Sequence, residues 1–278
     1  MNDPLAPQEQ AAALEQNPRR FALLVEYDGA GFAGSQLQSN ARTVQSVLEA
    51  AIEKATGERS RVAFAGRTDA GVHAIGQVAS FVSRTRLDAL TLQRALNAWL
   101  PEDAGVREAS EVDTDFDPRR WALRRHYRYQ IDNQPARSVL ERGRSWRVAS
   151  PLDVPAMQAA AQGMLGQHDF APFASPLDDP NASTQRELFA FDVRERRARV
   201  TCDLVANAFL PHQVRRMVGV LVQVGKGKLG VEEYVALLKA APSSAGTTAP
   251  AYGLYLVGVE YATPVFPKAA LDSDRELC

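Results

Sequence analysis

The stretch AGRTDAGVHA at residues 65–74 is followed by GQVASF at residues 76–81, which has the alternation of a β-strand. Glycines flank Arg67 and Asp69, so the backbone can turn tightly while two opposite charges project from one loop. Two interpretations follow: either Asp69 forms an Asx turn or caps the chain entering the strand, or the loop holds a ligand. The flanking segments are needed to choose between them.

The first half of the chain predicts a mixture of short strands and capped helices. Thr43 is a typical helix N-cap and Gly57 a typical stop, and an apolar stripe lies between them. The acidic stretch 101–118 is expected to contain an edge strand. The predicted elements are strands at 20–27, 62–65 and 77–82 and helices at 43–56 and 88–99.

The second half has the same mixed character. Its predicted elements are strands at 124–131, 188–194, 197–205 and 253–261 and helices at 153–165, 211–224 and 231–241. Few regular βαβ crossovers occur, so the predicted fold class is α+β, with a largely antiparallel central sheet and helices on one side. The predicted organisation is a flexible N-terminal tail (1–19), an N-terminal half carrying the 65–74 loop (20–115), a C-terminal half (116–263) and a C-terminal tail (264–278).

Composition excludes several classes of protein. The 278 residues are 45% hydrophobic and 23% charged, which is not the composition of a disordered or collagen-like chain. No apolar run approaches the ~20 residues that cross a bilayer, and the acidic opening is not a signal peptide, so a cytoplasmic location without a membrane partner is expected. Two cysteines exclude a disulfide scaffold.

Arginine is concentrated in one segment, although the net charge of the chain is only −1. Residues 116–147 contain nine arginines against three acids, a local charge of +6, interleaved with tryptophan and tyrosine. Such a surface suits a phosphate backbone with bases to stack, and the alternative is a solvated charged face. The arginines are residues 119, 120, 124, 125, 128, 137, 142, 144 and 147.

Three other features have both a structural and a functional interpretation. Tyr127 and Tyr129 share one face of the predicted strand. They are either buried core residues or aromatic groups that stack on a base. Arg215 lies on a helix that becomes apolar on nearly every side, so it must reach solvent or an anionic partner. Asp69 and His73, with His126 or His212, form a weak metal-ligand pattern.

These strings together resemble the tRNA pseudouridine synthase A family. The resemblance runs from residue 20 to residue 261, in the family's order and spacing. It rests on EYDGAGFAG (26–34) with Gln36, AGRTDAGVHA (65–74), HYRYQI (126–131), NAFLPHQVRRMVG (207–219) and APAYGLYL (249–256).

The resemblance implies a cofactor-free, metal-free isomerase that converts uridine to pseudouridine at positions 38, 39 and 40 of the tRNA anticodon stem-loop. It also implies two ferredoxin-like halves sharing one antiparallel sheet, and a homodimer whose subunits jointly hold one tRNA. The family's catalytic aspartate falls on Asp69, and its supporting residues fall on Arg67, Tyr127, Arg215 and Leu254.

Two positions depart from the family pattern. Ser35 stands where the family usually has tryptophan after the YDG string, so packing under that loop should differ. Phe116-Asp117-Pro118-Arg119 replaces the commoner Phe-His-Ala-Arg, so Asp117 adds an acid beside the arginine surface. Neither departure is expected to touch the catalytic set.

The reaction breaks the N1–C1′ bond and forms a C5–C1′ bond, so it needs neither redox chemistry nor an energy donor. The carboxylate of Asp69 could attack C1′ or uracil C6, or remove a sugar proton, and the residues do not choose among these routes. In a pocket that excludes water the carboxylate needs an opposing cation, which we assign to Arg215.

The remaining implied residues would handle the extruded base and the RNA backbone. Tyr127 is expected to stack on the uracil and is a candidate acceptor of the C5 proton. Arg67 is expected to fill the space that the extruded base leaves in the RNA stack, and Leu254 is expected to close the apolar side of the uracil pocket. The expected phosphate contacts are Arg119, Arg124, Arg125 and Arg128. The alternatives are a tRNA-binding or chaperone module without catalysis and a metal-dependent hydrolase.

Overall fold

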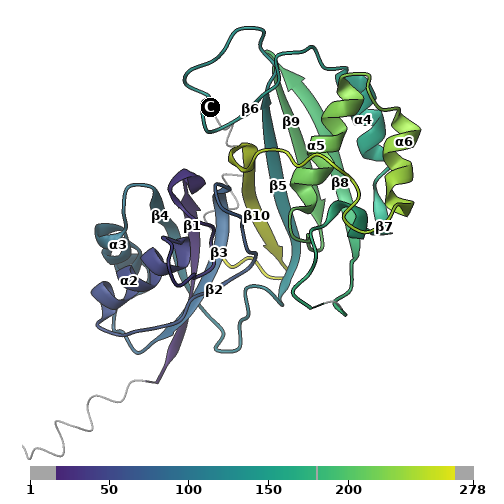
Figure 1. The fold of residues 1–278 in the computed structure, drawn as a ribbon. Coiled ribbons are helices and arrows are strands. Elements are labelled where there is room, and N and C mark those ends of the chain that lie inside the picture. Colours follow the sequence, from purple (N-terminus) through teal and green to yellow (C-terminus); the bar gives the residue numbers. More distant parts are fainter. Residues whose placement is uncertain (1–16, 180, 267–278) are drawn as a thin grey trace, which may run out of the picture.

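A ten-stranded sheet forms the middle of the molecule in the computed structural model, which describes residues 17–179 and 181–266 (Figure 1). The sheet order is β4 (Ala104–Val112), β1 (Arg19–Tyr27), β3 (His73–Ser83), β10 (Leu254–Tyr261), β5 (Ala122–Asp132), β9 (Arg199–Ala206), β8 (Gln185–Arg196) and β7 (Gly166–Asp169). β2 (Ala63–Phe64) adds to β3, and β6 (Trp146–Arg147) adds to β5. Most of both predicted tails lies outside the described residues.

The sheet is mixed rather than wholly antiparallel. The pairs β3–β10 and β5–β6 are parallel, and the other pairs are antiparallel. β10 is the last strand of the described residues, yet it lies between β3 and β5, with Tyr255 opposite His73 and Leu256 opposite Ala74. The α+β class is therefore confirmed, and the strand that joins the two parts of the sheet comes from the C-terminal end. A domain boundary at residue 116 stays a prediction.

Helix α2 (Val44–Thr56) is capped as its sequence predicts. The Thr43 side chain accepts the Ser46 N–H at 3.2 Å, and Gly57 ends the helix in the left-handed region at φ 77°. Asp88 caps α3 (Ala89–Trp99) in the same way by accepting the Thr91 N–H at 2.8 Å. Local capping thus sets both helices of the first half.

The helices of the second half are shorter than predicted. α4 (Val154–Gln162) ends at Gly163, and α6 (Val231–Ala236) continues only as a 3₁₀ turn (Leu237–Lys239). Almost every apolar residue of α5 (Gln213–Gly225) is buried. The other 3₁₀ turns are Gly29–Gly31, Ala171–Phe173 and Ala251–Gly253. None of the described helices is long and apolar enough to cross a membrane.

One apolar cluster spans both parts of the sheet. It joins Phe21 and Leu23 of β1 to Leu48 of α2, and Tyr129 of β5 to Met217 of α5. Because these strand residues alternate with residues outside the cluster, the helices pack on one face of the sheet, as predicted. In Figure 1, α2 and α3 lie at one end of the sheet and α4, α5 and α6 at the other. A smaller cluster on the opposite face is formed by Ala22, Leu24, Ala65, Val78, Phe116 and Phe266.

The joint between β3 and β10 offers a test of the fold. A Cβ on Gly76 would lie 2.0 Å from the Val257 carbonyl oxygen, whereas a Cβ on Gly258 would meet nothing within 4 Å. Gly76→Ala should therefore lower the free energy of unfolding by about 3 kcal/mol, because the strands must separate to admit the methyl group. Gly258→Ala, the matched control, should change it by less than about 0.5 kcal/mol. Urea unfolding of both variants measures this, and equal effects would contradict the close approach.

Candidate active site

The GRTDAG loop connects β2 to β3 and is held from beneath by the Gly34-Ser35 turn. The Thr68 N–H donates to the Ser35 hydroxyl oxygen at 2.9 Å, and the Ser35 N–H donates to the Thr68 carbonyl at 3.1 Å. The Tyr27 hydroxyl lies 2.8 Å from the Thr68 hydroxyl. Gly34 has φ 99°, and a Cβ there would come within 3.0 Å of the Thr68 carbonyl oxygen. The residue before Asp69 is thus fixed through both backbone and side chain.

Asp69 and Arg215 meet although 146 residues separate them in the chain. Arg215 Nη1 donates to Asp69 Oδ2 at 3.0 Å, and Arg215 Nε donates to the Ala249 carbonyl at 2.9 Å. The Arg215 side chain is 16% exposed. α5 therefore delivers a nearly buried cation to the loop carboxylate, and the Ala249 carbonyl fixes its direction.

Asp69 is more open to solvent than a water-excluding pocket requires. Its side chain is 33% exposed, so water reaches the carboxylate in the free protein. The expectation of a dry site is therefore wrong for this state, and a bound ligand would have to exclude the water. His212 also approaches the same oxygen, with Nε2 3.4 Å from Asp69 Oδ2.

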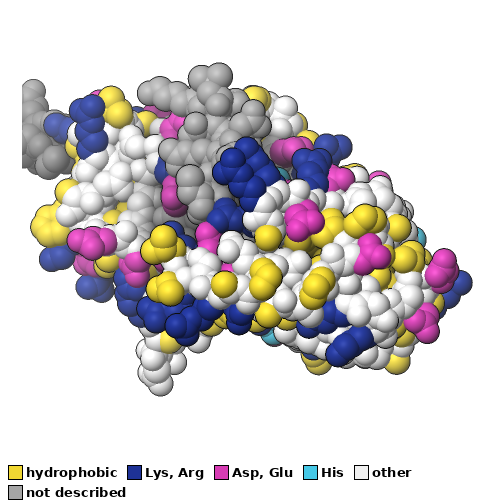
Figure 2. Space-filling model, turned by 90° about the horizontal axis from the view of Figure 1, so that it is seen from above, with side chains coloured by type: hydrophobic (Ala, Val, Ile, Leu, Met, Phe, Trp, Pro, Cys, Tyr) yellow, Lys and Arg dark blue, Asp and Glu magenta, His cyan; other side chains and the backbone are white. Residues whose placement is uncertain are grey.

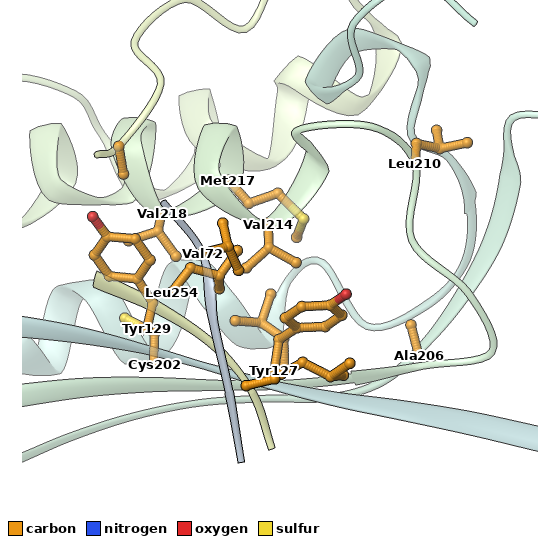
Figure 3. Close-up of a cluster of buried hydrophobic side chains, with 14 of the residues drawn as sticks. Val72, Tyr127, Tyr129, Cys202, Ala206, Leu210, Val214, Met217, Val218 and Leu254 are labelled. Atoms are coloured by element: carbon orange, nitrogen blue, oxygen red, sulfur yellow. The ribbon is translucent and has the colours of Figure 1, made fainter. Parts of the chain in front are cut away.

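Tyr127 and Leu254 belong to an apolar layer between the sheet and α5, the helix that carries Arg215, and we call this layer the apolar floor (Figure 3). Both are buried, and Figure 3 shows them between the sheet and α5, near Val72, Val214 and Val218. The Tyr127 ring meets Phe209 edge-on at a centroid distance of 5.2 Å. Burial raises the pKa of Tyr127, and Tyr27 and Asp69 raise it further, so its hydroxyl is protonated at neutral pH.

The Arg67 side chain is open to solvent. It is 56% exposed, and Nη1 lies 3.6 Å from Asp178 Oδ2, on a carboxylate that is itself 99% exposed. Such an open ion pair contributes little to stability. The guanidinium is therefore available to another anion.

The four arginines predicted to bind phosphate have different surroundings. Arg119 and Arg124 are exposed. Arg125 is 8% exposed, and its guanidinium donates to the carbonyls of Ala65, Arg119, Ala122 and Asn207. Burial lowers the pKa of Arg125. Arg125 is thus a support beneath the GRTDAG loop and is not placed to bind RNA, which corrects the expectation.

Arg128 is also already engaged. Its Nε donates to Asp203 Oδ1 at 2.8 Å and its Nη2 donates to Asp203 Oδ2 at 3.3 Å, while His126 Nε2 lies 2.9 Å from the same Oδ1. Burial raises the pKa of Asp203, but the bonds from His126 and Arg128 outweigh it and hold that pKa below its usual range. Phosphate binding by Arg128 would therefore have to compete with a carboxylate.

The arginine-rich segment 116–147 nevertheless remains largely on the surface. Arg125 is buried and Arg128 half-buried, and the other seven arginines are exposed. Seen from above, the basic side chains form separate groups among acidic and apolar ones rather than one stripe (Figure 2). Asp117 accepts the N–H groups of Arg119 and Arg120 at 2.8 and 2.9 Å, so this departure from the family pattern shapes the turn that carries Arg119.

Of the histidines singled out by the sequence, His212 lies beside Asp69, whereas His73 and His126 are bonded elsewhere. His73 Nδ1 accepts the Gly29 N–H at 3.0 Å, its ring stacks on Tyr255, and burial lowers its pKa. His126 lies with Asp203. Among the described residues, no group of three or more His, Cys, Asp or Glu side chains could hold a metal ion.

Two neighbours of the site were missed by sequence reasoning. Ser35 was expected not to touch the catalytic set; it bonds Thr68, the residue between Arg67 and Asp69, and so supports their loop through that neighbour. His212 was considered only as a metal ligand, although its place three residues after Phe209 in the NAF string was a signal that it enters the site.

Removing the Ser35 hydroxyl should loosen the loop. Ser35→Ala leaves the buried Thr68 N–H without its acceptor, so we expect a loss of about 1 kcal/mol in the free energy of unfolding and a lower activity. Thermal unfolding measures the first effect. Ser110→Ala, on edge strand β4, is the control, and its stability and activity should remain close to those of the parent protein. If Ser35→Ala changes stability and activity as little as this control does, the Ser35 hydroxyl does not hold the loop.

Fold and site together define an α+β protein in which a loop carboxylate is paired with an arginine from a buried helix. The sequence matches the family model described as tRNA pseudouridine synthase over residues 23–119 and 160–262. The chain belongs to this family. Asp69, Arg215 and Leu254 fall within the matched ranges, and Tyr127 falls between them.

Relatives cover most of the chain. A tRNA pseudouridine synthase A from Roseiflexus castenholzii is 46% identical over 266 residues, which is 92% of this chain and 94% of that protein. Proteins of the same name from Acidiphilium cryptum and Myxococcus xanthus are 45% and 43% identical, over 90% and 87% of this chain and 99% and 92% of their own lengths.

Proposed function

We propose that this protein isomerises uridine to pseudouridine at positions 38, 39 and 40 of the tRNA anticodon stem-loop, with Asp69 as the catalytic nucleophile or base and without a cofactor. The observation that carries the proposal is the 3.0 Å contact between Asp69 and Arg215, on a GRTDAG loop and a helix of a tRNA pseudouridine synthase family member. We also propose that it acts in the cytoplasm as a homodimer.

The pair suits a reaction that exchanges a C–N bond for a C–C bond within one nucleotide. Arg215 compensates the charge of Asp69 before the substrate binds and can remain beside it while charge moves onto the uracil. Because Arg215 is also bonded to Ala249, it need not reorganise during the reaction.

The apolar floor suits a base that has left its stack. Unstacking costs a few kcal/mol, which aromatic contact with the uracil can offset. Tyr127 is proposed as the stacking surface and Leu254 as the apolar wall. Accepting the C5 proton as phenolate is disfavoured for Tyr127, because its raised pKa keeps the hydroxyl protonated.

Arg67 and the exposed arginines suit the RNA around the target. A planar guanidinium that is 56% exposed beside the site could occupy the place of the extruded base. Arg119 and Arg124 are proposed to contact phosphates, so binding should weaken as salt rises.

A tritium-release assay tests the proposal. Purified protein is incubated with tRNA transcripts labelled at uracil C5, in excess chelator, and the expected result is release of tritium with an intact RNA chain. Binding without release would favour a tRNA-binding or chaperone module. Dependence on a metal, or cleavage of the RNA, would favour a hydrolase.

A further inference from the structure

His212 connects Asp69 to a second set of polar groups behind the site. Its Nε2 lies 3.4 Å from Asp69 Oδ2, and its Nδ1 lies 2.6 Å from the Ser175 hydroxyl oxygen. Arg216 Nη2 donates to the same hydroxyl oxygen at 3.2 Å. Arg216 is itself anchored, since its Nη1 donates to the carbonyls of Ala174 and Ser243 at 3.0 and 3.2 Å. A line of contacts therefore runs from Arg216 through Ser175 and His212 to the carboxylate.

These contacts favour one tautomer of His212. The Ser175 oxygen already accepts from Arg216, and among the described atoms His212 Nδ1 is the acceptor within reach of its hydroxyl proton. With Nδ1 accepting, the ring proton of neutral His212 is on Nε2, toward Asp69. The other tautomer would set the Nε2 lone pair against a carboxylate oxygen, which is repulsive.

The backbone of His212 supports a specific role for this side chain. The residue has φ 61° and lies in the left-handed region, immediately before α5. Non-glycine residues in this region are strained and cluster at functional sites. The conformation sets the imidazole between Ser175 and Asp69.

We propose that His212 is a positioning residue for Asp69, and that Ser175 and Arg216 fix its tautomer. Arg215 donates an N–H to Oδ2, and His212 Nε2 lies 3.4 Å from the same oxygen. Oδ1 makes no hydrogen bond with the described residues, so it is the oxygen left to meet the substrate. The 3.4 Å separation is long for a hydrogen bond in the free protein and is expected to shorten when RNA excludes water.

The kinetic role rests on the proposed isomerase function. Without His212 the carboxylate keeps a single N–H donor from Arg215, because Arg215 Nε is committed to Ala249. The carboxylate can then rotate, and the fraction of time in the reactive orientation falls. Since His212 acts on Asp69 and not on phosphates, its loss should lower kcat and leave KM for tRNA unchanged.

Two substitutions of different length separate positioning from folding. Asn tolerates the left-handed region and can still bond Ser175, but it is too short to reach Asp69. His212→Asn should keep the melting temperature and KM of the parent and lose about tenfold in kcat. His212→Gln places an amide N–H near the site of Nε2 and should recover most of that loss. Ser175→Ala should lower kcat about threefold by releasing the tautomer.

Other outcomes would overturn the inference. A kcat for His212→Asn equal to that of the parent would show that Asp69 needs no second donor. An effect on KM alone would place His212 in RNA binding, and equal losses in the Asn and Gln variants would assign it a role other than donating to Asp69.

A spectroscopic measurement tests the contact without any assay of activity. The chain has four histidines, so the ¹⁵N resonances of His212 can be assigned by their absence from the His212→Asn spectrum. The expected signature is an unprotonated Nδ1 and a protonated Nε2 in the neutral ring, lost in Ser175→Ala. A protonated Nδ1 in the neutral ring would refute the proposed tautomer whether or not the protein proves to be a pseudouridine synthase.

Discussion

Asp69→Asn is expected to abolish pseudouridine formation, with a rate loss of at least about 10⁴-fold, while the protein still folds and binds tRNA. The amide has the shape of the carboxylate but is neither a nucleophile nor a base. Because the Asp69 side chain is one-third exposed, the free energy of unfolding should change by less than about 1 kcal/mol. Single-turnover tritium release gives the rate, and filter binding gives the affinity.

Asp178→Asn is the matched control for this prediction. Asp178 also faces the GRTDAG loop, 3.6 Å from Arg67, but its carboxylate is 99% exposed and has no assigned chemistry. Its loss should leave the rate of the chemical step unchanged. Turnover by Asp69→Asn within tenfold of the parent would remove Asp69 from the chemistry, and loss of tRNA binding would assign it a different role.

Arg215→Met should have the second largest effect, a loss of about 10²–10³-fold in kcat. The change removes the N–H donor from Asp69 and from the Ala249 carbonyl at once, and leaves the carboxylate without its cation. The buried Ala249 carbonyl then lacks a side-chain partner, so the free energy of unfolding should also fall by about 1–3 kcal/mol.

Arg215→Lys separates charge from geometry. Lysine keeps the positive charge but cannot present two fixed N–H groups to Asp69 and Ala249. We expect activity between those of the parent and Arg215→Met, with a partial loss of stability. Equal activity of the Lys variant and the parent would mean that charge alone matters, and full activity of the Met variant would contradict the role of the pair.

Local signals in the sequence predict the elements best. Thr43 and Gly57 define α2 because each acts on the backbone within four residues of itself. Asp88 does the same for α3. α4 and α6 end earlier than predicted because the apolar residues after them, Met164, Leu237 and Leu238, pack against the core without continuing the α-helix.

Strand order depends on contacts that no local pattern contains. The parallel pairing of β10 with β3 joins residues about 180 positions apart, and only tertiary packing selects it. The Asp69–Arg215 pair was predictable across a similar distance for a different reason. An arginine on a helix with apolar surroundings needs an anion, and the family resemblance indicated which one.

Counting arginines overestimated the number of side chains available to bind phosphate, and the reason is physical. Arg125 alternates in phase with Tyr127 and Tyr129, so the pattern that placed the tyrosines inside also placed Arg125 inside. The burial of Arg125 could therefore be predicted from the sequence. The pairing of Arg128 with Asp203 was not, because it depends on the register between β5 and β9.

Ser35 and His212 reach the site through the tertiary fold. Ser35 contacts Thr68 from 33 residues away, and His212 meets Ser175 from 37 residues away. Small polar side chains in loops form such contacts without any periodic signal. The supporting groups of a site are therefore harder to predict than its charged centre.

Base-resolution mapping of pseudouridine is the most direct measurement of the central claim. An unmodified tRNA transcript with uridines at positions 38, 39 and 40 is treated with the purified protein and, in parallel, with Asp69→Asn. The account predicts pseudouridine at these positions with the parent protein and none with the variant. Pseudouridine from the Asp69→Asn protein, or none in the anticodon stem-loop from the parent, would contradict it.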